Sequence, residues 1–208
     1  MSEFSDAVFV HTGHTALALE SVKVYPYRYE WRRLTDRWLA IFLEYPDYDL
    51  TRAELWMKQV SAQFPVMFFQ NASDHGWAYQ IFSAGQVIAE VQVSYELSWH
   101  MWVDLMEVRH PEMEFPYNEI GQDEVDRMYA EIEASEAFRI RVEEQYRGAA
   151  PDTFRLFGFS DEQIQIVRAA LDIAWYLDPA RRHEQVYAFA KSVELDSFDW
   201  MSFRYLSH

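Results

Sequence analysis

Four histidines lie in segments that favour turns or a short helix, and imidazole is a common ligand of zinc and other transition metals. His11 and His14 flank the turn HTGHT, His75 ends a polar turn, and His100 lies between two tryptophans. A metal site needs three or four such ligands, and neither H-x-x-x-H nor H-E-x-x-H spacing occurs. These histidines are therefore weak candidates for a metal site, because hydrated side chains in polar turns explain them equally well. We predict no cofactor.

Carboxylates form close pairs at Glu112/Glu114 and at Asp123/Asp126. A glycosidase uses two such groups as acid and base. The chain has 34 acidic residues, so pairs of this kind also arise by chance. Acid–base catalysis requires a cleft and shifted pKa values as well. A solvated acidic face is the simpler interpretation.

The acidic residues are concentrated in one part of the chain. Between residues 104 and 144 there are 13 Asp and Glu residues against four Arg, and the net charge of the whole chain is −16. Nucleic-acid backbones are bound mainly by Lys and Arg, so this balance argues against a nucleic-acid partner. Clustered negative charge instead speeds and orients the encounter with a basic protein.

Aromatic residues are abundant, and most of them fall at the spacing expected of a buried face. Trp99 and Trp102 are the exceptions, because they lie in a mixed segment where a sugar, a base or a partner could stack on them. We treat both as candidate binding residues.

The chain lacks the local signatures of several enzyme classes. Its six glycines are too far apart for a dinucleotide-binding fingerprint or a phosphate-binding loop. With no cysteine, thiol catalysis, disulfides and cysteine-based metal sites are excluded. Ser160 follows Gly158-Phe159 but lacks the second glycine of a nucleophile elbow, and a helix N-cap explains it better.

Two functions remain open. The first is a binding or regulatory protein that engages a basic protein partner through the acidic segment 104–144. The second is a small hydrolase or metal-dependent enzyme that uses histidines and carboxylates between residues 75 and 114. We favour the first because catalytic signatures are absent. Its predicted binding residues are Trp99, Trp102, Glu112, Glu114, Asp123 and Asp126.

A basic cluster on the expected first helix offers another role for the acidic segment. Arg28, Arg32, Arg33 and Arg37 are spaced so that neighbours meet on a helix. We expect this cluster to pair with the acidic segment inside the same molecule.

The strongest signal for local structure runs from Phe64 to Leu97, where three strands are predicted at 66–70, 77–82 and 87–95. A strand is expected at 7–11, ending in the polar turn HTGHT, whereas 16–25 is ambiguous between helix and strand. Apolar spacing predicts a helix over 29–43 and another after a capping box at Thr51–Glu54.

The last third of the chain is predicted to be mainly helical. A helix is expected over 123–146 with a bend near Ser135, and a second follows the capping box at Ser160–Gln163. A third should begin at Asp178-Pro179 and reach about Val193. The alternation over 198–205 favours one further strand.

These elements predict an α+β fold with a hairpin-rich antiparallel sheet of about four to five strands, packed against several helices. We expect residues 1–208 to form a single compact domain, with a soft division near 98–118 between an N-terminal α/β lobe and a mostly helical C-terminal lobe. Without a signal peptide or a long apolar run, a cytoplasmic location and no membrane partner are expected. The oligomeric state is not predicted.

Overall fold

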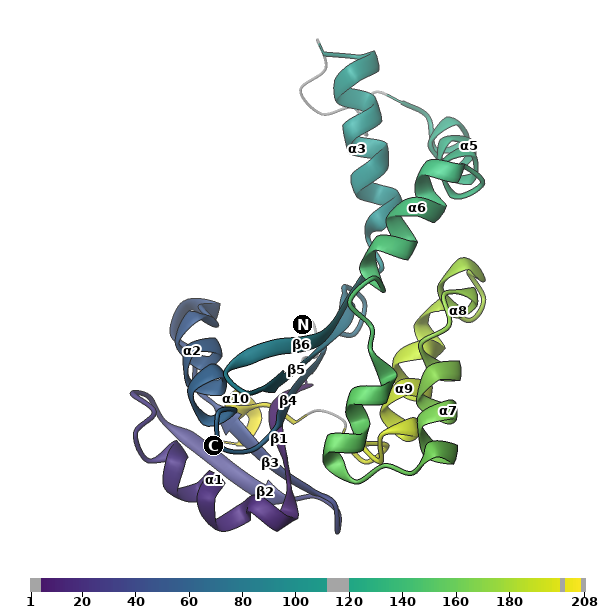
Figure 1. The fold of residues 1–208 in the computed structure, drawn as a ribbon. Coiled ribbons are helices and arrows are strands. Elements are labelled where there is room, and N and C mark those ends of the chain that lie inside the picture. Colours follow the sequence, from purple (N-terminus) through teal and green to yellow (C-terminus); the bar gives the residue numbers. More distant parts are fainter. Residues whose placement is uncertain (1–4, 112–119, 199–200, 207–208) are drawn as a thin grey trace.

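The centre of the molecule is a six-stranded antiparallel sheet with the strand order β2-β3-β1-β4-β5-β6. The computed structural model describes residues 5–111, 120–198 and 201–206 (Figure 1). The α+β class predicted from the sequence is confirmed, and the described sheet has more strands than the four or five expected. The strands are β1 (Ser5–His11), β2 (Tyr29–Arg33), β3 (Trp38–Leu43), β4 (Val66–Asn71), β5 (Gly76–Ser83) and β6 (Gln86–Ser94).

Helices lie between the strands and follow them along the chain. The α-helices are α1 (Thr15–Val22), α2 (Thr51–Val60), α3 (Leu97–Arg109), α5 (Gln122–Glu133), α6 (Glu136–Gln145), α7 (Asp161–Ala170), α8 (Ala174–Leu177), α9 (Gln185–Ser192) and α10 (Phe203–Leu206). Short 3-10 helices lie at η1 (Thr12–His14), η2 (Pro46–Tyr48), η3 (Pro151–Phe157) and η4 (Arg182–Glu184). Within the described residues, no helix has both the length and the apolar character needed to cross a bilayer.

Both faces of the sheet are covered, because successive residues of its inner strands point to opposite sides and both sides are apolar. On β1, Val8 and Val10 belong to a core shared with α1 and α2. Ala7 and Phe9 belong to a larger core shared with the C-terminal helices. In that second core the ring of Phe189 from α9 stacks on Tyr79 of β5 at 4.9 Å.

The three strands predicted between Phe64 and Leu97 are confirmed, with one change at the start of β6. Regular alternation over the predicted strand 87–95 would place Val87 on the same face as Ala89 and Val91. A register shift near Ile81 and Phe82 instead pairs Phe82 with Val87, and both pack in the core of α1 and α2. Ala89 and Val91 lie in the opposite core. A bulge of one residue therefore moves Val87 across the sheet.

The helix predicted over 29–43 is wrong, since this segment is the hairpin of β2 and β3. Every residue of β3 is buried, and this strand pairs with β1 on one side and β2 on the other. Trp31 would lie on the buried face of a helix over 29–43. It lies instead on the edge strand β2 and is 47% exposed. Six consecutive apolar residues in 38–43 fit a strand buried on both faces better than one side of a helix.

Two further local predictions need correction. Segment 198–205 was expected to add a strand, yet α10 lies there, and the described sheet gains no strand from it. The helix after Thr51 is present, but Thr51 is not its side-chain cap. Asp49 Oδ1 accepts the Thr51 backbone N–H at 2.9 Å instead.

The helical predictions for the C-terminal third are largely confirmed. The bend expected near Ser135 is a break between α5 and α6, where the Ser135 hydroxyl accepts the Phe138 N–H. The capping box of Ser160 and Gln163 opens α7 as predicted. The helix expected from Asp178 starts later, at Gln185.

Three of these helices form a projection that we call the arm, comprising α3, α5 and α6. Figure 1 shows the arm leaving the sheet at the end of β6 and extending away from it. Its helices pack on one another through a buried apolar seam that is continuous with the core of the C-terminal helices. The seam includes Trp102, Met106, Met128, Ile132, Phe138 and Val142.

Candidate functional site

The two tryptophans singled out in the sequence have opposite positions on α3. Trp102 is fully buried, and its ring stacks on Tyr129 of α5 at 6.1 Å. Trp99 is 41% exposed and faces solvent next to the exposed His100. Trp102 therefore holds the arm together, and Trp99 is the one of the two that a partner can reach.

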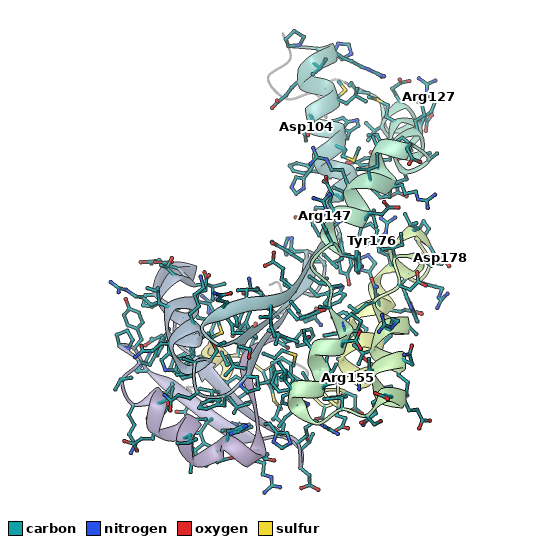
Figure 2. All side chains as sticks on the ribbon, viewed as in Figure 1. Asp104, Arg127, Arg147, Arg155, Tyr176 and Asp178 are labelled. Atoms are coloured by element: carbon teal, nitrogen blue, oxygen red, sulfur yellow. The ribbon has the colours of Figure 1, made fainter. Side chains whose placement is uncertain are left out.

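Acidic side chains cover the outside of the arm. Asp104 and Glu107 are exposed on α3, and Asp123 and Asp126 are exposed on α5. Figure 2 places Asp104 and Arg127 on this projecting part of the molecule. Arg127 pairs with Glu124 of its own helix. The predicted residues Glu112 and Glu114 lie outside the residues that the structure describes.

The arm is joined to the rest of the molecule by a partly buried ion pair. Arg182 Nη1 donates to Glu133 Oε1 of α5 at 2.9 Å, and Arg182 Nε donates to the Tyr176 carbonyl oxygen. The Ser98 hydroxyl donates to the same Glu133 oxygen at 2.6 Å. Burial raises the pKa of Glu133, but the bonds from Arg182 and Ser98 outweigh burial and hold this pKa below its usual value.

The predicted pairing between the arginine cluster and the acidic segment is wrong for three of its four arginines. Arg28 pairs with Glu44, and Arg33 pairs with Asp36. Arg37 binds Glu194 through two hydrogen bonds of 3.0 and 3.1 Å. The partners of these arginines lie outside segment 104–144, because a hairpin replaces the expected helix.

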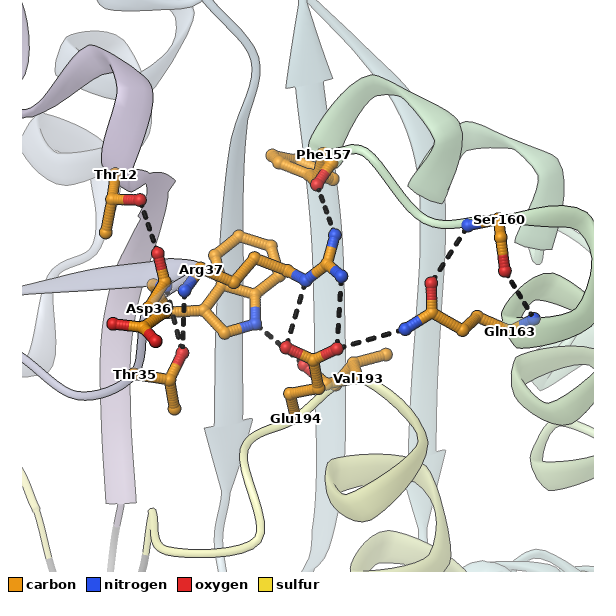
Figure 3. Close-up of polar contacts among 10 residues, drawn as sticks. Thr12, Thr35, Asp36, Arg37, Phe157, Ser160, Gln163, Val193 and Glu194 are labelled. Carbon is orange, nitrogen blue, oxygen red and sulfur yellow. Dashed lines mark hydrogen bonds and ion pairs between the residues drawn. The ribbon is translucent and has the colours of Figure 1, made fainter.

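Figure 3 shows that Arg37 is part of a structural junction between the β2–β3 hairpin and the C-terminal helices. Its guanidinium also donates to the Phe157 carbonyl oxygen at 2.8 Å and lies over the Phe159 ring. Glu194 in turn accepts from Gln163 of α7 at 3.1 Å. The guanidinium group of Arg37 is thereby paired within the molecule, where it joins the β2–β3 hairpin to the C-terminal helices.

Of the four candidate histidines, His11 and His14 come together, with ring centroids 6.3 Å apart, but His75 and His100 lie elsewhere. His11 ends β1 beside the first residue of β3, whereas His75 directly precedes β5, and the strand register places these two positions at opposite ends of the sheet. His14 stacks on Phe64, and His100 lies on the arm. Within the described part of the chain, no group of three His, Cys, Asp or Glu residues is placed to hold a metal ion.

The enzyme alternative has one local constellation in its segment. His75 Nδ1 lies 3.1 Å from Glu96 Oε1, and Asp74 is 3.7 Å from the other ring nitrogen. All three side chains are substantially exposed. Exposed pairs of this kind also occur on protein surfaces that have no catalytic role. The hydrolase or metal-dependent enzyme therefore stays a prediction.

A cavity that the sequence did not indicate lies where β1, β3 and β4 meet α10, with a volume of about 400 Å³. Asp6 of β1 lines it and is only 6% exposed. The Tyr45 hydroxyl is hydrogen-bonded to the Asp6 carboxyl group, and Arg204 lies close enough to act on it electrostatically. Gln70, opposite Asp6 in the β1–β4 pairing, also lines the cavity.

Burial raises the pKa of Asp6 to about 6, and this effect exceeds the opposing effects of Tyr45 and Arg204. The Asp6 carboxyl group is thus short of the positive charge that its buried position requires. Local motifs could not reveal this site, because its groups come from both ends of the chain. The one available signal was an Asp directly before the apolar run AVFV in the strand SDAVFVH.

No family model, no curated protein and no solved structure matches this chain.

Proposed function

We propose that this protein is a binding or regulatory protein that engages a basic protein partner through the outer surface of the arm. One observation carries the proposal. The acid-rich segment projects from the sheet (Figure 1), and Arg28, Arg33 and Arg37 pair with residues outside it, so these three arginines do not neutralise the arm.

The chemistry of the arm surface supports a protein as the partner. Exposed carboxylates such as Glu107, Asp123 and Asp126 attract a basic surface over a distance of about one Debye length, roughly 10 Å. Trp99 offers a large apolar contact within this charged surface. Tryptophans of this kind dominate the binding energy of many interfaces once water is excluded around them.

The first test asks whether charge on the arm is responsible for association. Partners are captured on the immobilised wild-type chain and identified by mass spectrometry, and capture is repeated at increasing salt. The arm variant carries Glu107→Gln, Asp123→Asn and Asp126→Asn. The control variant carries the same change of charge on the body, at the exposed residues Glu30, Glu162 and Glu184.

We expect the arm variant to lose about tenfold or more in affinity for a captured basic protein and the control variant to lose much less. Association of the wild type should also weaken steeply as salt rises. Equal losses in the two variants, or association that is insensitive to salt, would contradict the proposal.

A second test examines Trp99 with a matched tryptophan elsewhere. Trp99→Ala removes a half-exposed ring from the arm, and Trp31→Ala removes a ring of similar exposure from β2. For a partner that docks on the arm, Trp99→Ala should raise the Kd by about tenfold or more, as expected of an interface anchor. Trp31→Ala should leave the Kd unchanged.

A further inference from the structure

The cavity at Asp6 is built differently from an ordinary surface hollow. Part of its lining is apolar or aromatic and includes Leu43, Leu50 and Phe203. The lining also includes the buried carboxyl group of Asp6 together with Gln70 and Tyr45. A concave apolar site with a few convergent polar groups is the usual form of a small-molecule site.

The charges around the cavity determine which ligand fits. Arg28 lines it, but its guanidinium is engaged by Glu44, with 2.7 Å between Nη2 and Oε1. Arg204 lowers the pKa of Asp6 electrostatically, but burial raises this pKa by more. Among the residues that the structure describes, the lining holds the carboxyl groups of Asp6, Glu44 and Asp47 and the guanidinium groups of Arg28 and Arg204. The excess charge is therefore negative.

We propose that this cavity binds a small organic cation, an amine or amidine carried on an apolar or aromatic body. The cationic group meets the Asp6 carboxylate, and Gln70 and Tyr45 supply further polar contacts beside it. The body of the ligand lies against Leu50 and Phe203 and removes apolar surface from water. A cation is the group that a buried carboxylate lacks, since a buried charge is stable only when it is paired.

This site is separate from the arm. The cavity lies at β1, β3 and β4, whereas the arm begins after β6, and β5 lies between β4 and β6 in the sheet. The proposed cation site therefore does not depend on the proposed function, and the two can fail independently.

The probe for this site is benzamidine, a flat aromatic cation. It is compared with benzamide, which has nearly the same shape and no charge, and with benzoate, which is an anion. Binding is measured by the shift of the thermal midpoint with ligand concentration and by calorimetry, since a ligand of the native state raises this midpoint. A fragment of this size is expected to bind with a Kd of about a millimolar to ten millimolar.

The variants are Asp6→Asn and its control Glu162→Gln. Both remove one negative charge, but Glu162 is an exposed residue of α7 and is not part of the cavity lining. We expect benzamidine alone to bind, Asp6→Asn to weaken it at least about tenfold, and Glu162→Gln to change it by less than about threefold. Absence of binding by benzamidine, equal binding of benzamide or benzoate, or unchanged binding to Asp6→Asn would overturn the proposal.

Discussion

Arg182 of η4 lies 2.9 Å from Glu133 of α5, and this ion pair joins the arm to the C-terminal helices. The Arg182 side chain is only 10% exposed, so its positive charge must be compensated within the protein. Glu133 and the Tyr176 carbonyl oxygen provide this compensation. A buried pair of this kind adds little net stability compared with apolar residues, but removal of one partner leaves the other uncompensated.

Replacement of Arg182 should therefore destabilise the protein strongly. Arg182→Met removes the cation and leaves the Glu133 carboxylate with only the Ser98 hydroxyl. We expect a loss of about 2 to 4 kcal/mol in the free energy of unfolding, measured by urea denaturation at neutral pH. The control is Glu131→Gln, an exposed residue of the same helix, which should change stability by less than about 0.5 kcal/mol. Similar losses in both variants would argue against the role assigned to the pair.

Gly76 at the start of β5 should tolerate no side chain. Its φ is 141°, and a Cβ built there would lie 1.9 Å from the Val93 carbonyl oxygen of the paired strand. Gly76→Ala should cost about 3 kcal/mol or more, since both the backbone conformation and the close approach oppose it. Gly121→Ala is the matched control, because nothing lies within 4 Å of a Cβ at that position. Thermal unfolding of the two variants gives the comparison, and a mild effect at Gly76 would show that β5 and β6 can separate locally.

Ser160 should contribute the stability of a helix N-cap and no catalysis. Its hydroxyl accepts the Gln163 N–H, and the Gln163 side chain accepts the Ser160 N–H in return. Ser160→Ala should lower the free energy of unfolding by about 1 kcal/mol, and Ser160→Asn should restore most of it because asparagine is an equally good cap. If Ser160→Asn were as unstable as Ser160→Ala, the capping assignment would be wrong.

The sequence predicted the parts of the fold that depend on neighbouring residues. The hairpin of β5 and β6 and the capping box at Ser160 are local, and both were found from a few adjacent residues. The helix prediction for the β2–β3 segment was wrong because apolar residues three and four positions apart occur both in a helix and in a strand that is buried on both faces. Which of them forms depends on β1, which pairs with β3 from a distant part of the sequence.

The candidate sites were predictable to different extents. The acidic segment is a property of composition and could be located in the sequence, but the position of Trp102 inside the arm depends on its contact with Tyr129. The cavity at Asp6 could not be located at all, since Asp6 and Arg204 are separated by almost the whole chain. Sites assembled from both termini leave no local spacing to recognise.

The last prediction concerns the pH dependence of stability and rests on Asp6. Its pKa is about 6 in the folded state against 3.8 for an ordinary aspartate, so the folded state holds the proton more tightly than the unfolded state. The stability that this proton provides is complete below about pH 4 and is lost as pH rises through about 6. The groups that face Asp6 are Tyr45, Arg204, and the Arg28–Glu44 pair of the lining. Burial raises the pKa of Tyr45 as well, so Tyr45 stays neutral over this range.

Asp6→Asn mimics the protonated form and should remove this dependence. Relative to the wild type, it should gain about 2 to 3 kcal/mol in the free energy of unfolding near pH 8 and almost nothing near pH 4. Asp47→Asn, with the same loss of charge at an exposed position, should show no comparable change between these pH values. Urea denaturation of the three proteins across this range measures the difference directly. The difference in the free energy of unfolding between Asp6→Asn and the wild type grows with pH only if the folded state holds a proton on Asp6. If this difference were constant with pH, Asp6 would have an ordinary pKa and its charge would already be compensated.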